Sequence, residues 1–412
     1  MRKFVFALIF ISSSVFGQEN KFIDYLKNNS SVLDLKGDNQ WDMLKTDAEQ
    51  DQFIILGESH GTQAAQLIDF NLLKYLNKTV GTKNYIAELD FAQAATINEY
   101  LKTGDESLLK TVFRTWVKRH AQWGNSDFYE KIIKIRKLNK TVPKQKQITF
   151  IGIDQIQDFT LYFNLINKFI ADKQSPLLDS IKLISTTDLN DISFEGKCLF
   201  ATTFLQKIEQ NKIGFEKLFG EQLPLFEYLL QNLSHSDNAA AAKRPEYLFQ
   251  NFKQLYTILH LEDQKLYGMW GYFHSHQVPI YFLGEDFASR LISSDHPVSK
   301  KVITVLCMPV DSKYNVWDEK SETWTKRPFS YDDKTLFQVD GMEDVKQLST
   351  NDPTTVFKLN GPNSPFPKTG RLFNGSSPQG RVMGDFRLRD LAYQYLVIIR
   401  NSDWLNPLPP NY

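Results

Sequence analysis

Short apolar runs that end in polar residues recur along this chain. The first runs from Phe53 to Leu56 and leads directly into Gly57-Glu58-Ser59-His60-Gly61. A continuous apolar run of this length is typical of a strand buried on both faces, and the glycines allow a sharp turn after it. From Thr62 to Leu76 the apolar residues have helical spacing. The pattern therefore predicts a buried parallel strand, a tight turn and a helix that ends before Gly81.

The same pattern predicts further strands and the helices between them. Strands are expected over Asn84 to Leu89, Ile148 to Ile153, residues 265 to 273, Val302 to Met308 and Tyr395 to Arg400. Helices are expected over residues 22 to 26, 92 to 102, 106 to 118, 126 to 139 and 158 to 172. Strands separated by helices pair in parallel through right-handed crossovers. The expected fold class is α/β, with a largely parallel central sheet flanked by helices.

Two regions depart from this alternation. Residues 173 to 262 lack strand patterns and are expected to form a helical insertion, in which a helix starts near Arg244 because Pro245 suits a first helical position. Residues 311 to 384 are irregular and rich in turn residues, which indicates a small β-rich region or a lid. The predicted domains are therefore a first core half (18 to 172), the insertion (173 to 262) and a second core half (263 to 412) with this irregular, partly β region.

The amino terminus has the composition of a secretory signal peptide. Arg2 and Lys3 precede the apolar run Phe4 to Ile11, and small or polar residues follow up to Gly17. Cleavage is expected between Gly17 and Gln18, with export to the periplasm or the medium. The apolar run is too short for a permanent membrane span, and no later segment has 18 consecutive apolar residues. No cysteine lies nearby for lipid attachment.

The amino-acid composition limits the kinds of partner and ligand that this protein can bind. The 48 Lys and Arg residues balance 48 Asp and Glu residues, which argues against a nucleic-acid partner. The aromatic fraction of 13%, with 31 phenylalanines, suits either core packing or an apolar pocket. Cys198 and Cys307 could pair in an oxidising compartment. Two unpaired thiols are favoured, because Cys307 lies within an apolar, strand-like run.

Ionisable side chains follow four of the predicted strands. They are Glu58 with His60, Glu88, Asp154, and His274 with His276. Each alone could be a solvated residue at a turn. Because the carboxyl ends of parallel strands meet along one edge, where ligands bind in open α/β sheets, their recurrence favours a common site.

Two chemistries suit these residue types. A histidine near its neutral pKa can take a proton from water, a carboxylate can orient it, and an arginine can offset the developing negative charge. Alternatively, glutamates and histidines can bind a divalent metal that activates the water. Candidate arginines are Arg114, Arg119, Arg136 and Arg244. Arg244 precedes Asn251 by two helical turns, so these two side chains share a helix face.

In order along the chain, these motifs resemble the erythromycin esterase-type proteins. The matching segments are Gly57 to Thr62, Glu88, Arg136 with Asn139, Gly152 to Gln155, Arg244 with Asn251, and Trp270 to His276. The resemblance covers roughly residues 50 to 280. It implies an α/β core with a helical insertion, and hydrolysis of a small-molecule ester without a required cofactor. In the best-known members the ester is the lactone of macrolide antibiotics.

The resemblance also assigns roles. His60 corresponds to the general base that activates water, Glu58 and Glu88 to acidic residues of the same site, and His274 or His276 to a later histidine. His274 is preferred because it directly follows its strand. The predicted catalytic residues are His60, Glu58, Glu88 and His274. The predicted substrate-binding residues are Arg244, Asp154, His276, Asn251 and Arg136.

The chain departs from the family pattern at two points. One residue separates Glu58 from His60, where the family usually has two, and Trp270 is followed by Gly-Tyr-Phe before His274-Ser275-His276, where the family usually reads Trp-x-His-Asn-x-His. These departures bear on the identity of the substrate more than on the fold. The resemblance therefore does not imply that this protein cleaves macrolides. Wider relatives with a Gly-Glu-x-His pattern include metal-dependent peptidases and haem-binding export proteins. A metal-dependent hydrolase and a non-catalytic exported binding protein therefore remain alternatives.

Overall fold

The computed structural model describes residues 21–35, 37, 41–179, 192–236, 240–280, 284–333, 337–367, 369–373, 375–376 and 391–412. The predicted signal peptide and its cleavage position lie outside the described residues, as does part of the segment 311 to 384.

The central sheet has eight strands, most of them parallel to their neighbours. Their order is β1 (Ser30–Val32), β11 (Thr354–Lys358), β13 (Tyr395–Arg400), β6 (Val302–Val310), β2 (Phe53–Glu58), β5 (Leu266–Gly271), β3 (Asn84–Asp90) and β4 (Thr149–Asp154). Parallel pairing joins β13 to β6, β6 to β2, and β3 to both β5 and β4. The predicted fold class, α/β with a largely parallel sheet flanked by helices and a partly β carboxy-terminal region, is confirmed.

The chain divides into two compact units. The first comprises residues 1–80, 125–131 and 269–408, and the second comprises residues 81–124, 132–268 and 409–412. The boundary falls within β5, so this strand contributes residues to both units.

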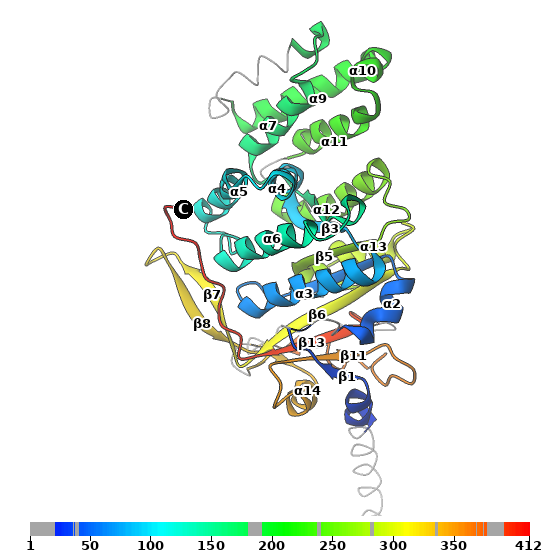
Figure 1. Ribbon diagram of the computed structural model, residues 1–412, viewed down its shortest axis with the longest axis vertical. Helices are drawn as coiled ribbons and strands as arrows, with labels where there is room; N and C mark the ends of the chain where they lie inside the picture. Colours follow the sequence, from blue (N-terminus) through cyan, green and yellow to red (C-terminus); the bar gives the residue numbers. More distant parts are fainter. Residues whose placement is uncertain are drawn as a thin grey trace, which may run out of the picture. The chain divides into compact units, whose positions relative to one another are not determined.

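In the first unit, β1, β11, β13 and β6 lie side by side (Figure 1), and β2 pairs with β6. Every residue of β2 and β6 is buried, which explains why their sequences are mostly apolar. The other elements of this unit are a helix over residues 21–28, η1 (Asp42–Leu44), α2 (Lys45–Gln50), α3 (Gln63–Val80), η6 (Tyr272–Ser275), α13 (Phe287–Ser293), β7 (Ser312–Asp318), β8 (Thr323–Phe329), β9 (Asp332–Asp333), β10 (Phe337–Val339), α14 (Met342–Leu348) and β12 (Gly375–Ser376).

Two features of the first unit differ from the sequence predictions. The segment 311 to 384 holds the antiparallel hairpin β7–β8, which extends away from the sheet in Figure 1 and agrees with the predicted β-rich region, but it also supplies β11, an unpredicted strand of the central sheet. Strand β5 ends at Gly271, because the chain turns there into the short helix η6 instead of continuing to Phe273.

In the second unit, β3 pairs with β4 and β5, and helices form the remainder. The helices are α4 (Phe91–Thr103), α5 (Glu106–Lys118), α6 (Ser126–Asn139, which begins in the first unit), η2 (Lys144–Lys146), α7 (Phe159–Ile170), η3 (Pro176–Leu178), α9 (Phe194–Gln210), α10 (Lys212–Phe219), η5 (Gly220–Gln222), α11 (Leu223–Ser234) and α12 (Ala240–Ile258). The predicted bounds of α4, α5 and α6 agree within one residue.

The insertion 173 to 262 is helical, as predicted, and phenylalanines fill its core. The rings of Phe219 and Phe226 stack with their centroids 4.4 Å apart, and Phe204 packs edge-on against Phe226. The expected helix start at Arg244 is wrong, because α12 already includes Ala240 and holds Pro245 in its interior. The alanines before Arg244 are strong helix formers, so the helix begins ahead of the proline.

Candidate active site

The carboxyl end of β2 places an acid and a base next to each other. Glu58 is the last residue of the strand and is 1% exposed, whereas His60 is 35% exposed. Glycine is needed on both sides of the segment Glu58-Ser59-His60. A Cβ at Gly57 would lie 2.2 Å from Ser275 Oγ, and Gly61 has a φ of 98°, which turns the chain toward α3.

Glu58 fixes the orientation of the His60 imidazole. His60 Nδ1 forms a hydrogen bond with Glu58 Oε1, so the ring is anchored to a buried carboxylate. The opposite edge of the ring faces Gly271, where an added Cβ would lie 3.0 Å from His60 Nε2. A single intervening residue is thus sufficient to pair this glutamate with this histidine.

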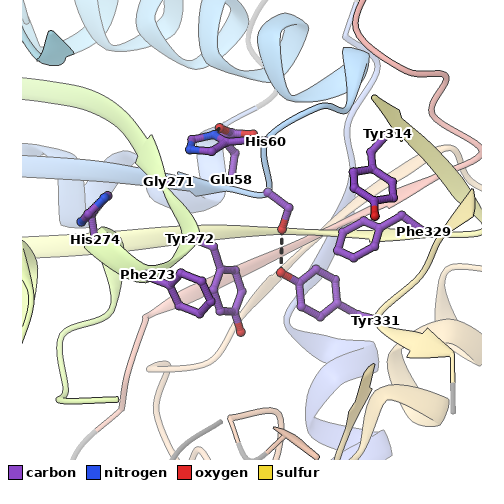
Figure 2. A pocket seen from close by; sticks show the side chains of 10 residues that line it. Glu58, His60, Gly271, Tyr272, Phe273, His274, Tyr314, Phe329 and Tyr331 are labelled. Carbon is purple, nitrogen blue, oxygen red and sulfur yellow. Dashed lines mark hydrogen bonds and ion pairs between the residues drawn. The ribbon is translucent and has the colours of Figure 1, made fainter. Parts of the chain in front are cut away.

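A second histidine–carboxylate pair lies beside the first. His274 Nδ1 donates a hydrogen bond of 2.7 Å to Asp286 Oδ1. Asp286 is the N-cap of α13 and also accepts from the backbone N–H of Phe287. The Cβ position at Gly271 would lie 3.4 Å from His274 Cδ2, so the two imidazoles flank the same glycine. Figure 2 shows this arrangement, with Gly271 between His60 and His274.

The two histidines line a cavity of about 430 Å³. Its lining residues are Glu58, Ser59, His60, Gly271, Tyr272, Phe273, His274, Tyr314, Phe329 and Tyr331. In Figure 2, the histidines lie at one end of this cavity, and Tyr314, Phe329 and Tyr331 lie at the other. A concave, largely apolar pocket with a few convergent polar groups is the usual form of a small-molecule site.

Two hydroxyl groups meet on the cavity wall. Ser59 Oγ lies 2.6 Å from Tyr331 Oη, within hydrogen-bond distance. Burial raises the pKa of Tyr331 well above its ordinary value, so its hydroxyl keeps its proton at neutral pH. The pair therefore supplies neutral hydrogen-bonding groups next to His60.

A buried ion pair lies close enough to Glu58 to respond to its charge. Lys131 of α6 pairs with Asp69 of α3, and the two side chains are 2% and 0% exposed. Burial lowers the pKa of Lys131, while the negative charges of Asp69 and Glu58 oppose this change. The Lys131–Asp69 ion pair therefore interacts electrostatically with the Glu58 carboxylate.

His276, a predicted substrate-binding residue, is not among the residues that line the cavity. It is 3% exposed, and its Nδ1 donates a hydrogen bond of 2.8 Å to the carbonyl of Tyr272. Burial lowers the pKa of His276 to about 4. The side chain is therefore neutral at pH 7 and packs beneath Tyr272, with ring centroids 4.5 Å apart.

This buried histidine predicts an acid-sensitive stability. Its folded-state pKa of about 4 lies below the ordinary value of 6.5, so its contribution is present above pH 6.5 and is lost as the pH falls toward 4. Between pH 7 and pH 5 the wild type is expected to lose about 2 kcal/mol of unfolding free energy from this group. Urea unfolding at the two pH values should show a smaller loss for His276→Asn, and an equal loss would contradict this assignment.

In the second unit, Arg244 joins the carboxylates at the ends of two strands. Its Nη2 donates to Glu88 Oε1 at 2.7 Å and to Asp154 Oδ2 at 2.6 Å, and its Nε donates to Asp154 Oδ1 at 2.9 Å. Burial acts to lower the pKa of Arg244, but the Asp154 and Glu88 carboxylates outweigh it and raise the pKa well above its ordinary value. Three of the predicted residues therefore form one charged cluster.

Asn251 and Arg136 both contact the backbone. Asn251 lies two turns after Arg244 on α12 and donates to the carbonyl of Ile153 at 2.9 Å, which ties the helix to β4. Arg136 donates to the carbonyl of Thr103 at the end of α4, at 3.2 Å. The substrate-binding role of either residue stays a prediction.

Three further properties of the described chain concern metal ligands, cysteines and membrane spans. There, no group of three or more His, Cys, Asp or Glu side chains is placed to hold a metal ion. Cys198 and Cys307 are both free thiols, which agrees with the prediction that they are unpaired. No helix in these ranges combines the length and the apolar character that crossing a membrane requires.

Several residues of the cavity and its surroundings were not predicted from the sequence. They are Asp286, Gly271, Lys131, Asp69 and the aromatic residues Tyr272, Phe273, Tyr314, Phe329 and Tyr331. Asp286 carries one local signal, because Asp-x-x-Ser before an apolar run marks a helix start. That signal identifies a cap but not a histidine partner.

The sequence matches no known protein-family profile and no curated protein. Solved structures share its fold. A protein from Bacillus cereus aligns with a TM-score of 0.70 and 18% identity over 95% of this chain and 99% of its own. A succinoglycan biosynthesis protein aligns with a TM-score of 0.65 and 15% identity over 95% and 99% of the two chains.

An erythromycin esterase variant in its open conformation also shares the fold. It aligns with a TM-score of 0.58 and 14% identity over 90% of this chain and 97% of its own. At this identity the likeness establishes a distant structural relationship, that is, a common fold.

Proposed function

We propose that this protein is an exported hydrolase of the erythromycin esterase type, which cleaves a small-molecule ester with a water molecule activated by His60. The observation that carries the proposal is the His60 imidazole, anchored through Nδ1 to the buried Glu58 and placed in a cavity beside a second histidine–carboxylate pair. A base oriented by a carboxylate is the arrangement that general-base hydrolysis requires. The shared fold of an erythromycin esterase supports the same reaction class.

The proposed reaction proceeds in two steps. His60 Nε2 removes a proton from water while the water oxygen attacks the ester carbonyl carbon, which gives a tetrahedral oxyanion. The intermediate then expels the alcohol oxygen, which takes the proton from the His60 imidazolium. Glu58 stabilises the imidazolium between these steps, as the carboxylate does in hydrolase triads.

His274 and the Ser59–Tyr331 hydroxyl pair line the same cavity as His60. We assign the hydroxyls of Ser59 and Tyr331 to hydrogen-bonding the carbonyl oxygen as negative charge develops on it. His274, whose Nδ1 proton is held by Asp286, is assigned to accepting a hydrogen bond at Nε2 from the substrate or the attacking water. A catalytic role for Glu88, and substrate binding by Arg244 and Asp154, remain proposals that rest on the family resemblance. Export rests on the signal-peptide pattern of residues 1 to 17.

The test is turnover of neutral esters by the purified protein. Proton release from esters such as benzyl acetate and ethyl acetate is measured in a pH-stat, with and without EDTA, together with elemental analysis of the same preparation. We expect hydrolysis that EDTA does not reduce. Stoichiometric metal that is lost together with activity would instead favour the metal-dependent alternative. No turnover of any ester would refute the proposal.

A further inference from the structure

Five aromatic rings form a continuous row along the cavity, which we call the aromatic belt. Its members, in order, are Phe273, Tyr272, Tyr331, Phe329 and Tyr314. Successive ring centroids are 5.5, 5.4, 5.3 and 5.1 Å apart. All five residues line the cavity, and Figure 2 shows them below and beside the site of His60. Each spacing lies in the range in which aromatic rings attract one another.

Three separate segments build the aromatic belt. Tyr272 and Phe273 follow Gly271 in η6, Tyr331 follows the end of β8, and the hairpin supplies Phe329 and Tyr314. Ser312 pairs with Phe329 and Tyr314 pairs with Arg327, so Tyr314 and Phe329 are diagonal neighbours on one face of the hairpin. The hairpin therefore contributes part of the cavity wall.

The belt combines fixed and accessible rings. Tyr272 and Tyr331 are 8% and 4% exposed and belong to the hydrophobic core, whereas Phe273 is 38% exposed and Tyr314 and Phe329 are half-buried. Such a wall offers preformed π-faces to a ligand without ordering many flexible side chains.

The charges of the cavity lining disfavour anionic ligands. Glu58 is the acidic residue of the lining, and none of the lining residues in the described chain is a lysine or an arginine. An anionic group on the belt would gain no direct cationic partner there. Neutral ring systems suit these π-faces best.

We infer that the aromatic belt is a specificity site for a neutral aromatic group carried by the ester substrate, with Tyr314 and Phe329 as its specificity-determining residues. This inference rests on the proposed function and adds the substrate class to it. The hydroxyl of Tyr331, a member of the belt, lies within hydrogen-bond distance of Ser59, which directly precedes His60, so the belt adjoins the part of the cavity wall that carries the base.

Binding tests the inference without requiring turnover. Benzylacetone is a ketone with the shape of benzyl acetate, and no water can cleave it as an ester. Titration of the full mature protein by calorimetry should show benzylacetone binding at least about tenfold more tightly than butanone, which lacks the ring. The para-carboxylate of benzylacetone should bind more weakly than benzylacetone itself.

Substitutions in the aromatic belt test whether benzylacetone binds there. Phe329→Ala and Tyr314→Ala should each weaken benzylacetone binding by about five- to tenfold. Phe329→Leu, which keeps most of the side-chain volume, should also weaken it. Trp324→Ala is the matched control, because Trp324 lies on the same hairpin but packs on Trp317, with centroids 5.6 Å apart, and does not line the cavity. This control should bind like the wild type.

The outcomes separate the inference from the proposed function. Benzylacetone binding no tighter than butanone, binding unaffected by Phe329→Leu, or preference for the para-carboxylate would each overturn the inference, even in an active esterase. Belt-dependent binding of benzylacetone supports it, even if none of the esters is hydrolysed. In that case the proposed function fails while the ligand class stands.

Discussion

Replacing Lys131 with methionine is expected to lower the free energy of unfolding by about 3–5 kcal/mol. The reason is that Lys131 and Asp69 are buried together, so the substitution leaves a carboxylate without its lysine partner at a site that is 0% exposed. Removing one member of a buried ion pair costs far more than the pair itself contributes, because the remaining charge loses its counter-ion. Urea unfolding at pH 7, followed by circular dichroism, measures the change.

Two further variants show whether the charge is responsible. Lys137→Met, an exposed position on the same helix, should change the stability by less than about 0.5 kcal/mol. The double variant Lys131→Met/Asp69→Leu should recover most of the loss, because replacing both members of a buried ion pair with apolar groups is often neutral. A Lys131→Met protein as stable as the wild type would contradict this account.

The parallel part of the fold could be predicted from the sequence because burial on both faces leaves an unbroken apolar run. Strand β13 has the predicted bounds, and β2 and β6 extend theirs by two residues each. The strands β1 and β11 were not predicted. Both are short, and β1 is only partly buried, so their side chains carry little of the apolar pattern that identifies the others.

The candidate site also has a part that could be predicted from the sequence and a part that could not. Glu58 and His60 could be found because they are neighbours in sequence at the end of a recognisable strand. Their surroundings could not be found, because they depend on distant contacts. Ser59 and Tyr331 are 272 positions apart, and Lys131 reaches Asp69 across 62 positions. Local patterns do not identify such pairs. The hairpin that supplies Tyr314 and Phe329 to the cavity wall lies in a segment that was expected to be irregular and partly β.

Replacing His60 with alanine is expected to lower kcat for ester hydrolysis by about 10²–10⁴-fold, the usual contribution of a general base. The KM for benzyl acetate should change little, because the aromatic belt is left in place. The fold should also be retained, since His60 is 35% exposed and its removal opens no core cavity. His235→Ala is the control, because that histidine is exposed and does not line the cavity.

The most direct test of the central claim is therefore the initial rate of benzyl acetate hydrolysis by wild-type, His60→Ala and His235→Ala proteins, measured in a pH-stat at equal concentrations. We expect His235→Ala to match the wild type and His60→Ala to retain at most about one hundredth of its rate, with an unchanged circular dichroism spectrum. A folded His60→Ala protein that hydrolyses the ester as fast as the wild type would contradict the role of His60 as the water-activating base.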